Sequence, residues 1–157
     1  MVAYSHPRPR LAPRARRLHW WRLPLAVAVV GVVSGVDLAW KASALAAGHG
    51  ALDAPSSLLR PFATVLVGMV ALICVLRLPW LCVPGMLLVV GGVASNVFSL
   101  ALWQAVPNPL GVHLAGEILH FNLADLCIYG GGLLFLAAAW WTIWRMPAER
   151  FAQLFPL

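Results

Sequence analysis

The chain has 157 residues, of which 62% are hydrophobic and only 10% are charged. Soluble domains carry roughly 25% charged residues, so this composition excludes an ordinary soluble domain and predicts an integral membrane protein. The formal net charge is +6. Most arginines lie beside apolar segments, which favours attraction to anionic membrane lipid over binding of nucleic acid.

Four apolar runs are long enough to cross a bilayer as helices, which takes about 20 residues each. Each run is continuously apolar rather than alternating, which favours helices over the strands of a membrane barrel. The predicted fold class is therefore all-α, a four-transmembrane-helix bundle over residues 23–144. The expected spans are residues 23–47, 62–78, 81–106 and 121–144.

The positive charges predict how the bundle is oriented. With four spans, all lysines and arginines fall on one side except Lys41 and Arg60. The positive-inside rule then places both termini in the cytoplasm. Residues 1–22, rich in Pro and Arg, are expected to be a disordered cytoplasmic tail, and residues 145–157 a second, short tail.

Two carboxylates lie inside predicted spans, where ionisable residues are functional candidates by default. Asp37 precedes Lys41 by four residues, so both lie on one helical face. They could form a self-neutralising pair with Lys41 reaching outward, or they could bind a substrate head group. Asp125 opens the last span, while Asp53 in the first outer loop is expected to be a solvated surface charge.

The third span carries polar residues that match the depth of Asp125. Asn96 and Ser99 are three residues apart on one face of this span. Since the third and fourth spans are antiparallel, four side chains are expected to converge near the outer surface: Asn96, Ser99, Asn122 and Asp125. A polar cluster that only holds the helices together is the alternative.

Three further patterns concern packing and loops. Gly31 and Gly35 form a G-x-x-x-G pair, which predicts close packing against another helix of the chain, with a dimer interface as the alternative. The outer segment 107–120 is too polar to span and could include a short interfacial helix. The three cysteines show no C-x-x-C spacing, so neither a metal site nor a cofactor is expected.

Three stretches resemble the motifs of one family. "FNLAD" (121–125) resembles the F-N-x-A-D motif of the lipoprotein signal peptidases, also called signal peptidase II. "GGVASNVFSL" (91–100) resembles the family's G-G-A-x-G-N-x-x-D-R motif, and "DLAWK" (37–41) resembles its D-x-x-T-K motif. The resemblance implies an intramembrane aspartyl peptidase of the bacterial cell membrane. Such enzymes remove the signal peptide of a prolipoprotein before its diacylglyceryl-modified cysteine, using one aspartate from each of the last two spans.

The sequence departs from this family at the first catalytic position. Ser99 stands where that aspartate belongs and Leu100 where the following arginine belongs, so only Asp125 of the pair is retained. An aspartyl dyad needs one ionised and one protonated carboxylate. We therefore expect a non-catalytic relative that binds a lipidated signal peptide or serves as a subunit of a membrane complex. The expected substrate-binding residues are Asn96, Asn122, Asp37 and Lys41.

Two other functions stay open. An active peptidase with an altered dyad could recruit Glu117, which lies eight residues before Asp125, or use Ser99 and Lys41 as a nucleophile pair. His113 and His120 are expected to be ordinary loop histidines. A small transporter is a weaker alternative. The expected partners are membrane lipid, a lipidated prolipoprotein or another membrane protein, with no nucleic acid.

Overall fold

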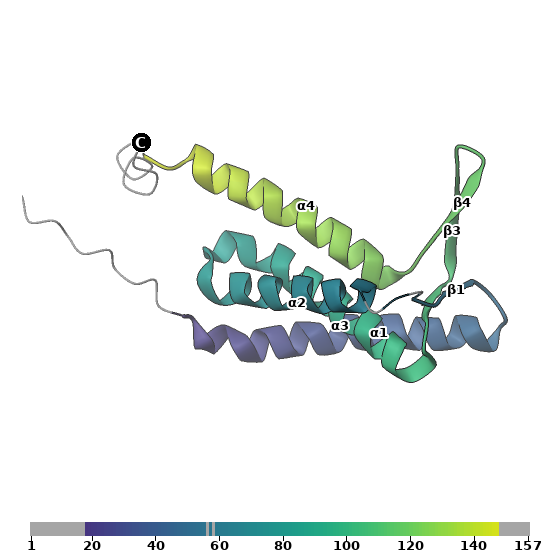
Figure 1. The fold of residues 1–157 in the computed structure, drawn as a ribbon. Coiled ribbons are helices and arrows are strands. Elements are labelled where there is room, and N and C mark those ends of the chain that lie inside the picture. The colour runs from purple at the N-terminus through teal and green to yellow at the C-terminus, as the bar shows by residue number, and fades with distance from the viewer. Residues whose placement is uncertain (1–17, 56, 58, 148–157) are drawn as a thin grey trace, which may run out of the picture.

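The computed structural model describes residues 18–55, 57 and 59–147. Each of its four long helices is long and apolar enough to cross a membrane, which confirms a four-helix integral membrane protein. Short strands occupy the connections at one end of the bundle, here named the loop end (Figure 1). The helices are α1 (Leu23–Ala46), α2 (Leu59–Arg77), α3 (Val83–Trp103) and α4 (Leu123–Trp144).

Helices α1 and α3 begin in the same way. A 3-10 turn precedes each of them: η1 (Trp20–Arg22) before α1 and η2 (Trp80–Cys82) before α3. Each helix then has proline in its first turn, where the missing N–H is not needed. Residues 20–22, assigned to the tail from the sequence, therefore belong to the first span. The rest of the predicted tails, residues 1–17 and 148–157, lies outside the described residues.

The four helices run alternately up and down, and α3 is the central one. It packs against α1, α2 and α4, and over half of its apolar window is buried, against 17% or less in each of the others. The remaining surfaces of α1, α2 and α4 expose many large apolar side chains, as suits helices long enough to span a bilayer. The described chain therefore starts and ends at the same end of the bundle.

Glycines allow α4 to approach α3 closely, but they are not the glycines expected from the sequence. A Cβ on Gly92 would meet the backbone oxygen of Ala124 in α4, and a Cβ on Gly85 would lie 2.6 Å from the oxygen of Gly131. Gly31 and Gly35 have no atom within 4 Å of such a Cβ. The prediction that this G-x-x-x-G pair packs within the chain is therefore wrong, because α1 turns its other face to α3.

At the end of the bundle opposite the loop end, one arginine joins the start of α1 to the end of α2. Arg22 is only 4% exposed and donates to the carbonyl oxygens of Val75 (2.9 Å) and Leu78 (2.7 Å) at the end of α2. Its guanidinium lies over the rings of Trp21 and Trp80, which stack at 5.7 Å. Cation–π contacts and satisfied helix-end carbonyls both stabilise this joint.

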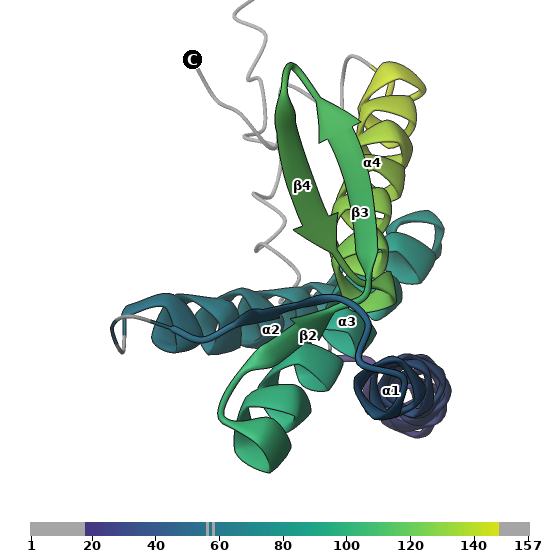
Figure 2. The same ribbon diagram turned by 90° about the vertical axis from the view of Figure 1, so that its right-hand side faces the viewer.

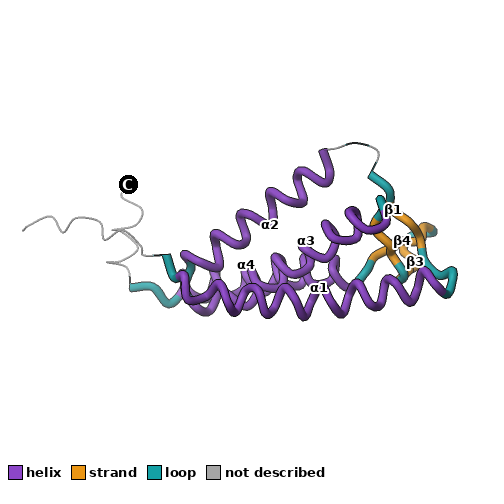
Figure 3. The backbone as a smooth tube through the Cα atoms, turned by 90° about the horizontal axis from the view of Figure 1, so that it is seen from below, coloured by secondary structure: helices purple, strands orange, loops and turns teal. Residues whose placement is uncertain are grey.

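Helix α2 leaves the bundle toward the loop end. Its buried residues, Ala71, Val75 and Leu76, all belong to its second half. Figure 3 shows α2 diverging from the other helices as it approaches the strands. The first half of α2 is thus held away from α4, with α3 beneath the gap.

The loop end carries two small antiparallel sheets. Strand β1 (Ala51–Asp53) pairs with β2 (Val106–Asn108), which brings the first outer loop beside the second. Strands β3 (Leu110–Leu114) and β4 (Glu117–Phe121) form a hairpin that projects from the bundle (Figure 2). The segment 107–120, which could have included a short helix, therefore forms strands and a turn. Ala115 and Gly116, both at positive φ, form the two-residue turn typical of a hairpin.

Candidate functional site

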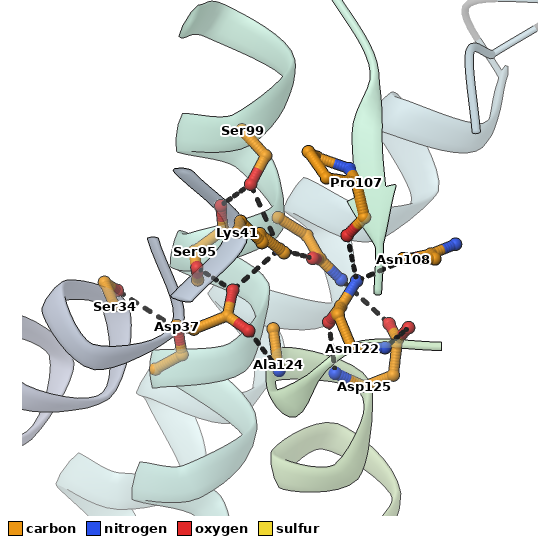
Figure 4. A network of polar contacts seen from close by, with 12 residues as sticks. Ser34, Asp37, Lys41, Ser95, Ser99, Pro107, Asn108, Asn122, Ala124 and Asp125 are labelled. Carbon is orange, nitrogen blue, oxygen red and sulfur yellow. Dashed lines mark hydrogen bonds and ion pairs between the residues drawn. The ribbon is translucent and has the colours of Figure 1, made fainter. Parts of the chain in front are cut away.

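A buried ion pair lies at the centre of the polar network in Figure 4. Lys41 Nζ is 2.7 Å from Asp37 Oδ2, and neither side chain has any exposed surface. The i, i+4 pair predicted from the sequence is thus present. Lys41 does not reach outward, however, since its ammonium group turns inward to α3. Inside the protein such a pair needs further hydrogen bonds to offset desolvation.

Helix α3 supplies these bonds through a parallel i, i+4 pair of serines. Ser95 Oγ donates to Asp37 Oδ2 at 2.5 Å, and Lys41 Nζ donates to Ser99 Oγ at 3.0 Å. Helices α1 and α3 run in the same direction. Ser95 therefore lies opposite Asp37, and Ser99, one turn later, lies opposite Lys41. Ser99 thus faces Lys41 and α1.

Asp37 also stabilises the start of α4. Its Oδ1 accepts the backbone N–H of Ala124 at 3.0 Å, one of the first-turn donors that have no partner within a helix. A carboxylate near a helix N-terminus is favoured by the helix dipole. One buried acid from α1 thus links three helices, because it contacts Lys41 in α1, Ser95 in α3 and Ala124 in α4.

Asn96 connects the buried pair to Asp125. Its Oδ1 accepts from Lys41 Nζ at 2.8 Å, and its Nδ2 donates to Asp125 Oδ1 at 2.9 Å. A lysine ammonium can only donate, so Lys41 fixes which way the Asn96 amide lies. The amide must therefore present its N–H₂ group to Asp125.

Asp125 and Asn122 form a capping box at the start of α4. The Asn122 side chain accepts from Asp125 N at 2.9 Å, while Asp125 Oδ2 accepts from Asn122 N at 3.2 Å. Each oxygen of Asp125 thus receives one N–H donor, from Asn96 on Oδ1 and from Asn122 on Oδ2. The motif "FNLAD" is explained here as a helix N-cap as well as a candidate site.

Asn122 ties the same helix start to the strands. Fully buried, its Nδ2 donates to Asn108 Oδ1 at 2.6 Å and to the Pro107 carbonyl at 3.4 Å. Both acceptors belong to β2. The side chain therefore joins the two ends of the segment that carries the hairpin.

A pocket of about 290 Å³ opens between the diverging part of α2 and helices α3 and α4. Its polar groups include Asn96, Asn108 and Asp125, and strand β1 with the start of α2 adds Asp53 and Arg60. Its apolar wall is formed mainly by Val67, Val93, Leu100 and Ile128. Mostly apolar walls with a few convergent polar groups are typical of ligand sites.

Asp53 lies elsewhere than the sequence predicted. This residue, expected to be a solvated surface charge, lines the pocket and lies 2.6 Å from Arg60 Nη2. Its side chain is 32% exposed and that of Arg60 is 66% exposed. The pairing of β1 with β2 brings Asp53 to the pocket, and no pattern in the local sequence indicates this.

The predicted site residues fall into two groups. Asn96 and Asp125 line the pocket, whereas Asp37, Lys41, Ser99 and Asn122 are fully buried behind it. Of the four residues predicted to converge, Asn96 and Asn122 contact Asp125, whereas Ser99 turns to Lys41. A role of the buried group in substrate binding stays a prediction, and it would have to act through Asn96.

The structure treats the two predicted alternatives, Glu117 as a second carboxylate and the Ser99–Lys41 pair, differently. Glu117 does not fold back, because it lies at the tip of the hairpin, as Leu114 does, and is exposed; His113 and His120 are exposed on the same hairpin. Ser99 and Lys41 do meet. Ser99 Oγ, however, donates to the Ser95 carbonyl at 2.9 Å, and Lys41 has three acceptors for its three N–H bonds. In this arrangement the Ser99 proton is directed to the Ser95 carbonyl and not to Lys41.

The charged groups that line the pocket are the Asp125 carboxylate and the Asp53–Arg60 ion pair. Asp125 can accept hydrogen bonds or attract a cation, and Asn96 and Asn108 add amide groups. Within residues 18–55, 57 and 59–147, no three His, Cys, Asp or Glu side chains gather where they could hold a metal ion.

Asn122→Ala tests the capping box and the link to β2 together. Removing an N-cap side chain costs about 1–2 kcal/mol, and the Asn108 amide would lose its partner as well. We expect a lower unfolding temperature in detergent and faster proteolysis of the hairpin. Asn122→Ser, which keeps a capping oxygen but has no amide to donate to Asn108, should fall between this variant and wild type. Equal stability of all three would contradict the assignment.

The comparisons with known proteins concern the fold. No family model and no curated protein matches the chain. A solved structure of a bacterial membrane enzyme is similar, with a TM-score of 0.64 over 86% of this chain and 98% of that chain. The two sequences are 12% identical. The chain therefore has the fold of a bacterial membrane enzyme, with four membrane-spanning helices.

Proposed function

We propose that this protein is a non-catalytic relative of signal peptidase II that holds a lipidated signal peptide in the pocket without cleaving it. The observation that carries this proposal is the environment of the two dyad positions. Asp125 receives N–H donors from Asn96 and Asn122 on both oxygens, and Ser99 lies behind Asn96 against Lys41. Only one of the two positions carries a carboxylate, whereas an aspartyl dyad needs one ionised and one protonated carboxylate.

The shape of the pocket supports an extended, partly apolar ligand. The pocket has α2 on one side and α3 and α4 on the other, and these are apolar helices of membrane-spanning length. Val67, Val93 and Ile128 offer apolar contacts, and Asn96 and Asp125 offer hydrogen bonds to a peptide backbone. A retained pocket with a lost dyad favours binding over hydrolysis.

The proposed location follows from charge. The positive-inside rule places the end that carries Arg22, Arg77 and Arg145 in the cytoplasm. The pocket and the strands would then face the outer side of a bacterial cell membrane, where lipidated precursors present their signal peptides. A cysteine-accessibility assay in intact cells, labelling a cysteine at Gly116, would report this orientation.

A second candidate is an active peptidase that uses Asp53 as the second carboxylate. The favouring observation is that Asp53 and Asp125 line the same pocket. For catalysis the Asp53–Arg60 ion pair would have to open, so that one carboxyl could carry a proton while the other activated water. Exposed ion pairs contribute only about 0–1 kcal/mol, so opening it is energetically accessible.

A cross-linking and cleavage assay separates these functions. Purified protein is mixed with a diacylglyceryl-modified prolipoprotein that carries a photo-reactive group in its signal peptide. We expect a cross-link in the wild type and no cleavage, while an authentic signal peptidase II cuts the same substrate in parallel. Val67→Trp, which fills the pocket, should reduce cross-linking several-fold. Val70→Trp is the matched control, because Val70 is similarly exposed on α2 (53% against 48%) but does not line the pocket.

Three outcomes would contradict the proposal. Equal cross-linking in both tryptophan variants would mean that the pocket does not hold the peptide. Cleavage by wild type that disappears in Asp125→Asn would establish an active enzyme. Loss of that cleavage in Asp53→Asn as well would assign the second carboxylate to Asp53.

A further inference from the structure

The β3–β4 hairpin has two chemically different faces. Residues directly opposite each other in an antiparallel pair share a face, and successive residues alternate between faces. The pairs Gly111–His120 and His113–Ile118 therefore lie on one face, which carries both histidines. The other face, here named the apolar face, consists of Leu110, Val112, Leu114, Leu119 and Phe121, with Glu117 at the tip.

The apolar face has no partner in the described part of the chain. Every residue from Gly111 to His120 is exposed, including Val112 (48%), Leu119 (55%) and Leu114 (62%). A two-stranded hairpin is marginally stable in water unless something covers an apolar face. The face therefore needs an occupant.

The hairpin extends sideways from the loop end of the bundle, across the direction of α1. Figure 1 shows it edge-on and crossing the direction of α1, and Figure 2, which looks along α1, shows its broad side. Its two faces thus point along the helix axes, one toward the level of the membrane and the other away from it. A hairpin in this position runs parallel to the bilayer surface.

The hairpin is also continuous with the lipid-facing surface of the bundle. Its second strand ends at Phe121, next to Asn122, which caps α4. The exposed side of α4 that follows is apolar and includes Leu126 and Leu133. The lipid that covers α4 therefore reaches the base of the hairpin.

From these observations we infer that the β3–β4 hairpin is an in-plane membrane anchor, whose apolar face rests on the lipid leaflet at the loop end. Apolar side chains buried at the headgroup boundary are stabilised by the same transfer free energy as in an interfacial amphipathic helix. The two histidines face water, and Glu117 reaches water at the tip. The inference does not depend on the proposed function.

An anchored hairpin would fix the height of the pocket relative to the lipid surface. Only Pro109 separates the hairpin from β2, whose residues Val106 and Asn108 line the pocket. The hydrogen bond between Asn108 and Asn122 holds both ends of the segment together. The leaflet would thus position one wall of the pocket.

Fluorescence quenching at adjacent positions tests this anchor. In a background with Cys74, Cys82 and Cys127 replaced by alanine, single cysteines at Leu119 or His120 carry the fluorophore NBD. The full chain is reconstituted in phosphatidylcholine–phosphatidylglycerol vesicles. We expect nitroxide-labelled lipid to quench position 119 several-fold more than position 120, and aqueous iodide to do the reverse. Val112 and His113 form a second such pair on β3.

Other results would overturn the inference. Equal iodide quenching at both members of a pair would mean that the hairpin stands in water, free to add a strand from another protein. Protection of position 119 from both quenchers would mean that protein, such as a second copy, covers the face. Each labelled variant must keep the unfolding temperature of the unlabelled background, and the second pair provides the comparison if one variant does not.

Discussion

Lys41→Met should destabilise the protein by about 3–5 kcal/mol, because it leaves Asp37 as a buried charge without its partner. Asp37 would keep only Ser95 and the Ala124 N–H as donors, and Asn96 would lose the contact that orients its amide. The free energy of unfolding can be measured by titrating purified protein in mixed micelles with sodium dodecyl sulfate. The loss should appear as a lower midpoint.

Two controls make this result specific. Asp37→Asn combined with Lys41→Met removes both charges and should recover a large part of the lost stability, since Asn can still accept from Ala124. Arg60→Met breaks the exposed pair with Asp53, which is expected to contribute only about 0–1 kcal/mol. If Lys41→Met were as mild as Arg60→Met, the pair would not be buried as described.

Gly92→Ala should cost about 3 kcal/mol or abolish folding, although it adds only one methyl group. The new Cβ would meet the backbone oxygen of Ala124, and it would lie 2.8 Å from Ile128 Cγ1. A backbone oxygen cannot rotate away as a side chain can, so α3 and α4 must separate. Overpacking of a tight core costs about 1–3 kcal/mol even where side chains can adjust.

Gly31→Ala is the matched control for this substitution. Both glycines lie within membrane-spanning helices, but nothing lies within 4 Å of a Cβ on Gly31. We expect an unchanged or slightly higher unfolding temperature, because alanine is the better helix former. A large loss in Gly31→Ala would show that this surface packs against another protein, and an unchanged Gly92→Ala would contradict the close contact of α3 with α4.

The polar network explains why an acid is tolerated near the start of α4. Asp125 is not isolated, since it caps its own helix with Asn122 and accepts from Asn96. Through Asn96 it is joined to Lys41 and then to Asp37. The same residues that resemble a peptidase motif thus contribute to holding three helices together. A substitution in this network can therefore change stability without changing function, so unfolding and cross-linking are measured separately.

The sequence alone was sufficient for the four spans and for part of the site. Continuous apolar runs predict helices in lipid, where backbone groups must bond within their own segment. The i, i+4 spacing of Asp37 and Lys41 predicts their ion pair because it depends only on helix geometry. The approach of Asn96 to Asp125 could also be predicted, because it depends only on where the spans begin and end and on their directions.

The tertiary structure decided which helix each polar side chain faces, because helix rotation depends on packing that a single run of apolar residues does not encode. Ser99 turns to Lys41 rather than to Asp125, and Gly92 rather than Gly31 meets a neighbouring helix. Asp53 reaches the pocket only because β1 pairs with β2, a contact between distant loops. Continuous apolar runs determined the helices of this protein, and contacts between residues far apart in the chain determined its pocket.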